Sequence, residues 1–261
     1  MKKPEVSVII PVFNGERYMR RCLQSVAAQT AGPLEVVLVD DCSTDSGMDI
    51  ARSFAETEGS GISFVFGRTP CNSGPGAARN LGLSLAGGEW VAFLDVDDTL
   101  QPDFCSKLLQ AARSAGTDLA CCDILISGTV HRNPDTEDKR HFLRHFIAYF
   151  TTFLYRRQML LERELFFPCT TSAEDTCFLT CCVLAANGIA QVKEPLYNYL
   201  TRDGSLSRCR SRRRAVQRLS SIWKMIAYAK THGLFKPYSM EIKIIAIKKG
   251  YLMALRDLIR G

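Results

Sequence analysis

Short apolar segments alternate with amphipathic segments through the first half of the chain. Residues 6–12, 35–39, 62–66, 90–94 and 118–126 are rich in bulky apolar side chains, which is typical of strands buried on both faces of a sheet. The segments between them have apolar residues at helical spacing, so we expect helices there. Strands that alternate with helices in this way predict an α/β fold with an open, mostly parallel, doubly wound sheet.

The second half of the chain has a different pattern. We expect residues 152–167 to form a helix that Pro168 ends, a second helix to begin at residues 173–175, and an extended segment at residues 192–199. The last segment, residues 241–260, combines apolar residues at helical spacing with Lys and Arg, which predicts an amphipathic helix. Its apolar stripe consists of Ile244, Ile247, Tyr251, Leu255 and Leu258.

Charge is distributed unevenly along the chain. The net charge of +6 combines −6 over residues 1–200 with +12 over residues 201–261. The second of these segments includes six arginines between Arg208 and Arg218, with no acidic residue among them. A basic tail on an acidic body indicates an anionic partner for the tail, and a membrane surface, a nucleic acid and a polyanionic substrate all remain open at this point.

Cysteine usage and the first residues bear on the cellular compartment. The 11 cysteines include no CxxC pair, and an odd number argues against a disulfide framework, so we expect most of them to be small buried hydrophobes. The first apolar run is short and is broken by Glu5 and Pro11, which argues against a secretory signal. No apolar run approaches the ~20 residues that span a bilayer. These features together predict a cytoplasmic protein.

Acidic side chains follow two of the predicted strands. Asp40 and Asp41 end the second strand, and Asp95, Asp97 and Asp98 follow the fourth. Like charges this close repel each other unless a cation lies among them. Hard oxygen ligands suit Mg²⁺ or Mn²⁺, usually shared with substrate phosphates, and ligands of open α/β sheets bind beyond the carboxyl ends of the strands. A solvated acidic loop with helix-capping residues is the alternative.

Two further segments are candidates for binding or catalysis. Gly74 and Gly76 precede a predicted helix and resemble the start of the dinucleotide-binding motif G-x-G-x-x-G, but Arg79 replaces its third glycine. The loop also follows the third strand and not the first. Both features disfavour hydride chemistry. The loop can still approach a phosphate or ribose, and Arg79 can pair with a phosphate or with a nearby Asp. Glu174 and Asp175 either serve catalysis or are acids that favour the first turn of a helix. Asn14 is suited to cap the first helix, near Glu16.

Six segments occur in order over residues 5–207: VSVIIPVFN, VVLVDDCSTD, NSGPGAARNLGL, WVAFLDVDD, SAEDTCF and YNYLTRDGSLS. Together they resemble the family 2 inverting glycosyltransferases of the GT-A fold. Two positions depart from the family pattern: Cys42 stands where that family usually has Gly, and Val96 where a small residue is common.

The resemblance implies a nucleotide-sugar donor and a divalent cofactor, Mg²⁺ or Mn²⁺. It implies that Asp97 ligates the metal and that Asp175 is the catalytic base. The implied donor-binding residues are Pro11, Phe13 and Asn14 around the base pocket, Asp41 at the base, Asn72, Gly74 and Arg79 beside the nucleoside, Asp95 at the ribose or sugar, and Arg202 at the diphosphate.

The implied function is inverting transfer of a sugar from a nucleotide-sugar to a hydroxyl acceptor in surface polysaccharide or glycoconjugate synthesis. The family most often uses UDP-sugars, so the resemblance implies a UDP-sugar donor. A metal-dependent nucleotidyltransferase and a nucleotide-sugar-binding pseudoenzyme are the alternatives. Residues 1–207 would form the GT-A domain, with a nucleotide-sugar-binding half (1–126) and an acceptor-side half that holds the catalytic base (127–207). Residues 208–261 would form a basic helical extension that binds the inner face of a membrane carrying a lipid-linked acceptor, and we expect no nucleic acid partner.

Overall fold

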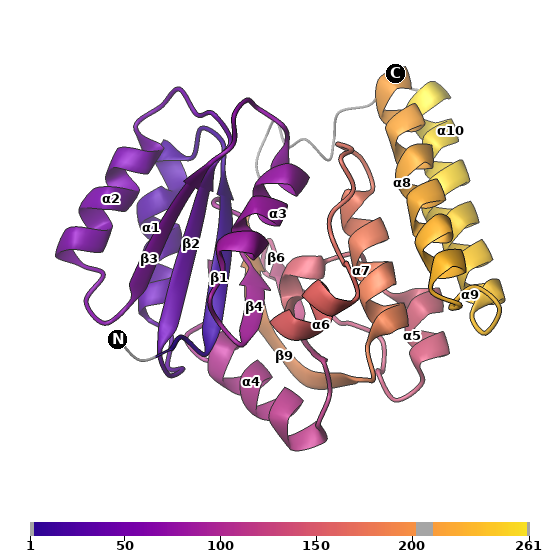
Figure 1. The fold of residues 1–261 in the computed structure, drawn as a ribbon, viewed down its shortest axis with the longest axis horizontal. Coiled ribbons are helices and arrows are strands. Elements are labelled where there is room, and N and C mark those ends of the chain that lie inside the picture. Colours follow the sequence, from indigo (N-terminus) through magenta and orange to yellow (C-terminus); the bar gives the residue numbers. More distant parts are fainter. Residues whose placement is uncertain (1–2, 202–210, 260–261) are drawn as a thin grey trace.

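The computed structural model describes residues 3–201 and 211–259, which form a central sheet covered by helices (Figure 1). The nine strands of this described part run in the order β3-β2-β1-β4-β8-β6-β9-β5, and β7 pairs with β6. The strands are β1 (Val6–Val12), β2 (Leu34–Asp40), β3 (Ser63–Arg68), β4 (Trp90–Phe93), β5 (Thr99–Leu100), β6 (Leu119–Ile126), β7 (Thr129–His131), β8 (Phe153–Arg156) and β9 (Ile189–Tyr199).

Helices connect these strands and follow the last of them. The helices are α1 (Glu16–Ala27), α2 (Gly47–Thr57), α3 (Pro75–Leu85), α4 (Phe104–Ala115), α5 (Lys139–His145), α6 (Arg157–Glu162), α7 (Glu174–Ala185), α8 (Arg212–Thr231), α9 (Ser239–Ile245) and α10 (Leu252–Ile259). A 3₁₀ turn covers Phe150–Thr152, and a π-helical segment, Ala246–Tyr251, joins α9 to α10.

The predicted fold class is confirmed in the N-terminal half of the sheet. β3, β2, β1 and β4 are all parallel, with Val8 opposite Val36 on one side and opposite Ala92 on the other. Every residue of β1, β2 and β4 is buried, because helices cover both faces of a parallel sheet. This explains why these strands are continuous apolar runs in the sequence.

The expectation of one helix over residues 152–167 is wrong. Its first part is β8, which lies antiparallel between β4 and β6, and only Arg157–Glu162 is helical. Phe153, Leu154 and Tyr155 are fully buried in this position, so packing between two strands decides the conformation of a short apolar run whose local pattern also suits a helix.

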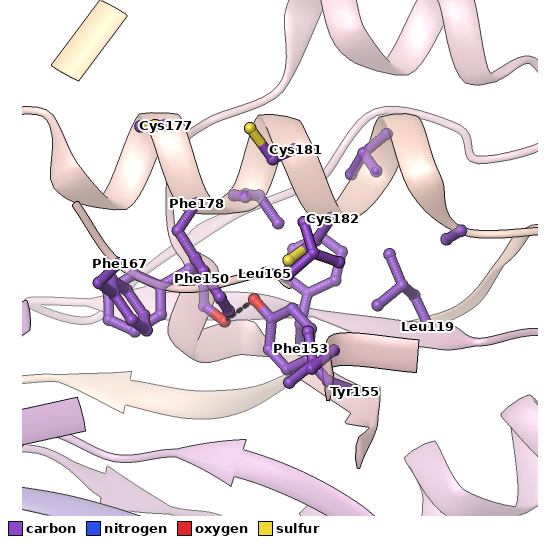
Figure 2. Packing of buried hydrophobic residues seen from close by; sticks show 14 of the residues in the cluster. Leu119, Phe150, Phe153, Tyr155, Leu165, Phe167, Cys177, Phe178, Cys181 and Cys182 are labelled. Atoms are coloured by element: carbon purple, nitrogen blue, oxygen red, sulfur yellow. Dashed lines mark hydrogen bonds between the residues drawn. The ribbon is translucent and has the colours of Figure 1, made fainter. Parts of the chain in front are cut away.

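An aromatic core lies between the sheet and α7 (Figure 2). The rings of Phe167 and Phe178 are stacked with centroids 3.9 Å apart, and both meet Phe93 edge-on. Cys182 of α7 is fully buried in the same core. In the described part of the chain ten cysteines are free thiols, and seven of these are buried, as expected for cysteines that act as small hydrophobes.

Among the C-terminal helices, α8 packs on α7, α9 packs on α5, and α10 packs on α8, the long helix seen in Figure 1. Their buried side chains, among them Ile222, Met225 and Ile242, belong to the same core as the aromatic residues. The predicted boundary at residues 207 and 208 falls outside the described residues and remains a prediction. No helix of the described part is long and apolar enough to cross a membrane.

The predicted helix over residues 241–260 is present as α9, the π-helical segment and α10. Small residues on one side face the body: a Cβ at Gly250 would lie 2.9 Å from the side chain of Ile222, so only glycine permits this approach. Most of the predicted apolar stripe faces outward, with Ile247, Leu255 and Leu258 about half exposed, at 53%, 52% and 48%.

Candidate active site

The loops that follow β1 and β2 are tied together beyond the strand ends. Asn14 Oδ1 accepts hydrogen bonds from the backbone N and the hydroxyl of Thr44, at 2.9 and 3.3 Å. The expectation that Asn14 caps α1 is therefore wrong. Asp45 supplies the cap from the other loop, accepting from Glu16 N at 2.8 Å, and it also accepts from Gly47 N at 3.1 Å. Phe13, beside Asn14, is 49% exposed.

Asp41 is buried and holds the loop that precedes α3. Its Oδ1 accepts from Thr69 Oγ1 at 2.7 Å and from Ser73 N at 2.9 Å, and its Oδ2 accepts from Gly74 N at 2.8 Å. Gly74 has φ +85°, which favours glycine. Asn72 and Pro11 belong to the same region, Asn72 exposed in this loop and Pro11 buried in β1.

Cys42 takes a backbone conformation typical of glycine. Its φ is +63°, in the region that costs energy for a residue with a Cβ. The thiol donates to the carbonyl of Thr69 at 3.3 Å. The structure thus keeps the turn at the position where Cys replaces the usual Gly.

Arg79 on α3 joins two parts of the site. Its guanidinium lies 2.7 Å from Asp95 Oδ1 and is buried over the rings of Phe150 and Phe167, at 4.5 and 5.3 Å from the ring centroids. Burial favours the neutral form, but the charge and hydrogen bond of Asp95 raise the pKa of Arg79. Arg79 is therefore a buried cation beneath the carboxylate cluster.

Asp98 links the carboxylate cluster to the end of β9. It is buried, accepts from Tyr197 Oη at 2.6 Å and accepts from Leu200 N at 2.8 Å. Burial and the charge of Asp95 raise the pKa of Asp98 to about 8. Leu200 leads directly toward Arg202, which lies outside the described residues.

Asp97 lies between Asp95 and Asp98 in the carboxylate cluster. It is half-buried, and its backbone carbonyl accepts a hydrogen bond from Arg21 at 2.6 Å. Residues 3–201 and 211–259 contain no group of three or more His, Cys, Asp or Glu able to hold a metal. Carboxylate oxygens such as those of Asp95 and Asp97 are hard ligands of the kind that Mg²⁺ and Mn²⁺ take together with substrate phosphates, so the chemistry of these residues fits such an ion.

Glu174 and Asp175 begin α7. A Cβ at Gly76 of α3 would lie 3.9 Å from the side chain of Glu174, so the start of α7 packs near the start of α3. Burial raises the pKa of both carboxyl groups, and the charge of Asp175 helps to raise that of Glu174 to about 7. The charge of Arg79 lowers both pKa values. The same buried arginine thus pairs with Asp95 and acts on the Glu174–Asp175 pair, although 79 residues separate Asp95 from Glu174 in the sequence.

Sequence reasoning missed the residues that support this arrangement. Asn80 forms two hydrogen bonds with the backbone of Phe167. Its position in the segment NSGPGAARNLGL, next to Arg79, could have indicated a role for it. Tyr197, the first residue of the segment YNYLTRDGSLS, donates a hydrogen bond to Asp98. Ser221 of α8 contacts the loop before Asp175, and no local pattern in the sequence indicates this contact.

The fold with these strand-end carboxylates is that of the GT-A glycosyltransferases. A crystal structure of Staphylococcus aureus TarS in complex with UDP-GlcNAc matches with a TM-score of 0.75, 24% identity, and coverage of 91% of this chain and 72% of that chain. The mannosyltransferase PcManGT from Pyrobaculum calidifontis, in complex with GDP-Man and Mn²⁺, matches with a TM-score of 0.70, 21% identity, and coverage of 99% and 75%. At these identities the matches establish the fold.

The chain belongs to glycosyl transferase family 2, whose family model matches residues 7–173. It is 31% identical over 216 residues to the putative glycosyltransferase EpsH of Bacillus subtilis, covering 76% of this chain and 61% of that protein. It is 33% identical over 211 residues to the poly(ribitol-phosphate) beta-N-acetylglucosaminyltransferase TarS of Staphylococcus aureus, covering 75% and 35%. The chain thus spans about three-fifths of the length of EpsH.

Proposed function

We propose that this chain catalyses inverting transfer of a sugar from a nucleotide-diphosphate-sugar, specifically a UDP-sugar, to an acceptor hydroxyl. The observation that carries the proposal is that buried Arg79 pairs with Asp95, while its charge also acts on Glu174 and Asp175. The side chain of Glu174 packs against Gly76 of α3, the helix that holds Arg79. A donor-side carboxylate and a candidate base thus interact with the same arginine. Membership of glycosyl transferase family 2 supports this function.

The donor would lie across the carboxyl ends of the parallel strands, as ligands of open α/β sheets do. In our proposal the exposed ring of Phe13, with Pro11 and Asn14, frames the base pocket. Asp41 would contact the base while it holds Ser73 and Gly74 in place. Asn72, Gly74 and Arg79 would lie on the nucleoside side, Asp95 at the ribose or sugar, and Arg202 at the diphosphate.

Asp97 would hold Mg²⁺ or Mn²⁺ together with the donor diphosphate. When bound, such an ion supplies positive charge beside the phosphate oxygen on which negative charge grows as the glycosidic bond breaks. Asp98 and Tyr197 would keep the adjacent backbone in place through their 2.6 Å hydrogen bond. The Mn²⁺ in the PcManGT complex supports this choice of ion.

Asp175 would accept the proton of the acceptor hydroxyl as its oxygen attacks the anomeric carbon. Attack opposite the leaving diphosphate in a single displacement inverts the anomeric configuration. A general base is most effective when its pKa lies near the working pH. Burial moves the pKa of Asp175 upward, in that direction.

The activity should be lost at acidic pH. Asp175 acts only when deprotonated and burial raises its pKa, so we expect kcat to fall as the pH decreases, with an apparent pKa above the ordinary range for Asp. Glu174→Gln removes the neighbouring carboxyl group and should move this acidic limb, because two interacting carboxyl groups titrate as a pair. The measurement is kcat from about pH 5 to pH 9. An unmoved limb would show that the two groups do not titrate together.

Turnover of a panel of nucleotide sugars tests the proposed function. A glycosyltransferase releases free nucleoside diphosphate when a hydroxyl acceptor, such as a simple glycoside, is present. A nucleotidyltransferase would instead release pyrophosphate from a nucleoside triphosphate and a sugar phosphate, and a pseudoenzyme would bind the nucleotide sugar without turnover. Release of nucleoside diphosphate from a UDP-sugar is the expected result, and its absence over the whole panel would contradict the proposal.

We also propose that the acceptor is a growing glycan of a surface polysaccharide or glycoconjugate. The relatives include a succinoglycan biosynthesis protein of Rhizobium meliloti, 28% identical over 246 residues, and TarS, whose name gives poly(ribitol-phosphate) as its substrate. No nucleic acid partner is part of the proposal.

The outer face of the C-terminal helices would bind the anionic inner face of the membrane from the cytoplasm, where a lipid-linked acceptor would be available. This outer apolar face consists of Ile247, Tyr251, Leu252, Leu255 and Leu258, each at least 48% exposed. Exposed Lys243, Lys248 and Arg256 lie among these residues. Apolar residues interleaved with basic ones are typical of interfacial helices, and each basic residue near an anionic surface contributes about 1 kcal/mol.

Vesicle co-sedimentation checks this membrane proposal. The full chain should sediment with phosphatidylglycerol vesicles, less with phosphatidylcholine vesicles, and less with phosphatidylglycerol vesicles when salt screens the charges. Leu255→Ser with Leu258→Ser should reduce binding because the substitutions remove buried apolar area. Leu161→Ser, at an exposed leucine of α6, is the matched control. Equal recovery with both kinds of vesicle at low salt would overturn the proposal.

A further inference from the structure

The segment of residues 168–173, here named the catalytic loop, leads directly into Glu174 and Asp175. On the donor side it is fixed by α3. Asn80 Oδ1 accepts from Phe167 N at 2.8 Å, and Asn80 Nδ2 donates to Phe167 O at 2.9 Å, just before the loop. Gly76 packs so closely that a Cβ there would lie 3.4 Å from the carbonyl oxygen of Pro168.

On its other side the catalytic loop is fixed by α8. Ser221 is fully buried, and its hydroxyl donates to the carbonyl of Ser172 at 2.8 Å. Its oxygen lies 2.6 Å from Thr170 Oγ1. Because the single proton of Ser221 goes to Ser172, the hydroxyl of Thr170 donates to Ser221. One turn earlier on α8, Gln217 accepts a hydrogen bond from Thr171.

The last residue of the catalytic loop has a strained backbone. Ala173 has φ +59°, in the left-handed region that is unfavourable for a residue with a Cβ. Such a conformation persists only where surrounding contacts determine it. The hydrogen bond from Ser221 acts on Ser172, the residue immediately before Ala173, and Asp175 follows two residues after Ala173.

We propose that Ser221 is a positioning residue for the transfer reaction. By holding Thr170 and Ser172, it fixes the backbone at Ala173 and so sets where Asp175 meets the acceptor hydroxyl. This inference rests on the proposed role of Asp175 as the base. It makes α8 a part of the catalytic unit, although the residues of α8 follow the segment that carries the family motifs.

Ser221→Ala tests the proposal because it removes both hydrogen bonds and leaves the rest of α8 unchanged. We expect kcat to fall about tenfold or more, since small displacements of a catalytic group cost up to about 10²-fold. The KM for the UDP-sugar should stay within about twofold, because the donor-side contacts of Asn80 and Gly76 remain. Ser220→Ala is the matched control: it removes the same hydroxyl about 100° further around the helix and should change neither constant.

The possible outcomes of this comparison separate a positioning role from a purely structural one. A fall in kcat for Ser221→Ala alone, with an unchanged circular dichroism spectrum, supports the proposal. Equal kcat values for the two serine variants, or an increase in KM that matches the loss of kcat, would overturn it. If Ser221→Ala does not fold, Gln217→Ala on the surface of α8 must show the same selective loss of kcat at a smaller size, or the proposal fails. Absence of turnover by the parent chain would instead contradict the proposed function itself.

Discussion

Asp175→Asn is expected to lower kcat by roughly 10² to 10⁴-fold, the contribution of a positioned general base, while the affinity for the nucleotide sugar changes little. Asn has nearly the size of Asp and still forms hydrogen bonds, but it cannot accept the proton of the acceptor hydroxyl. The effect should therefore appear in kcat. Steady-state kinetics give kcat, and calorimetric titration with the nucleotide sugar gives the donor affinity.

The comparison variant for this prediction is Glu174→Gln, which neutralises the neighbouring acid and should be much milder at neutral pH. If Asp175 only stabilises the start of α7, Asn would replace it with little loss, because Asn and Asp favour helix N-termini similarly. A general base contributes at least about 10²-fold. If Asp175→Asn keeps more than about a tenth of the parental kcat, another residue is the base.

Asp97→Asn is expected to abolish metal-dependent transfer and leave the fold intact. Asp97 is half-buried at the end of β4, and the hydrogen bond from Arg21 goes to its backbone carbonyl, which the substitution preserves. A neutral amide binds Mg²⁺ or Mn²⁺ far more weakly than a carboxylate does. Loss of one electrostatic contact to the developing charge typically costs about 10² to 10³ in kcat.

Titration of activity with Mn²⁺ and with Mg²⁺ measures this effect, together with the thermal unfolding midpoint. Asp103→Asn is a suitable control, because Asp103 is an acid close in sequence that lies before α4 and pairs with Lys107. Full activity of Asp97→Asn at low Mn²⁺, equal to that of the control, would show that Asp97 does not ligate the metal.

The sequence predicts those parts of the molecule that depend on local pattern. β1, β2 and β4 are buried on both faces, so each is a continuous apolar run that identifies a parallel strand. The carboxylates at Asp41 and Asp95 follow these strands directly, and parallel strands deliver their ends to the same edge of the sheet. The topology alone therefore places both carboxylates at the same edge of the sheet.

Other features depend on contacts between distant residues and were not predictable in the same way. β8 forms because its backbone pairs with β4 and β6 while Phe153 and Tyr155 are buried in the aromatic core, which overrides a local pattern that also suits a helix. The cap of α1 comes from Asp45, on a different loop. Ser221 reaches Ser172 across 49 residues of sequence.

The C-terminal helices show how far periodicity can be used. The apolar stripe with Ile247, Leu255 and Leu258 was evident from spacing, but spacing does not say which side of a helix meets the body. In the π-helical segment and α10, small residues such as Gly250 and Ala254 lie on the buried side, because they allow the helices to approach closely. The large apolar residues of the stripe in these two elements consequently remain on the outside, whereas in α9 the buried side includes Ile242 and Ile245.

In the proposed mechanism, Asp175 activates the acceptor hydroxyl for a single displacement at the anomeric carbon. Proton NMR of the first product formed from a UDP-α-sugar and an acceptor glycoside tests this mechanism, because the anomeric coupling constant reports the configuration of the new bond. We expect a β-linked product, which Asp175→Asn should form far more slowly. An α-linked product, with the donor configuration retained, would rule out a single displacement.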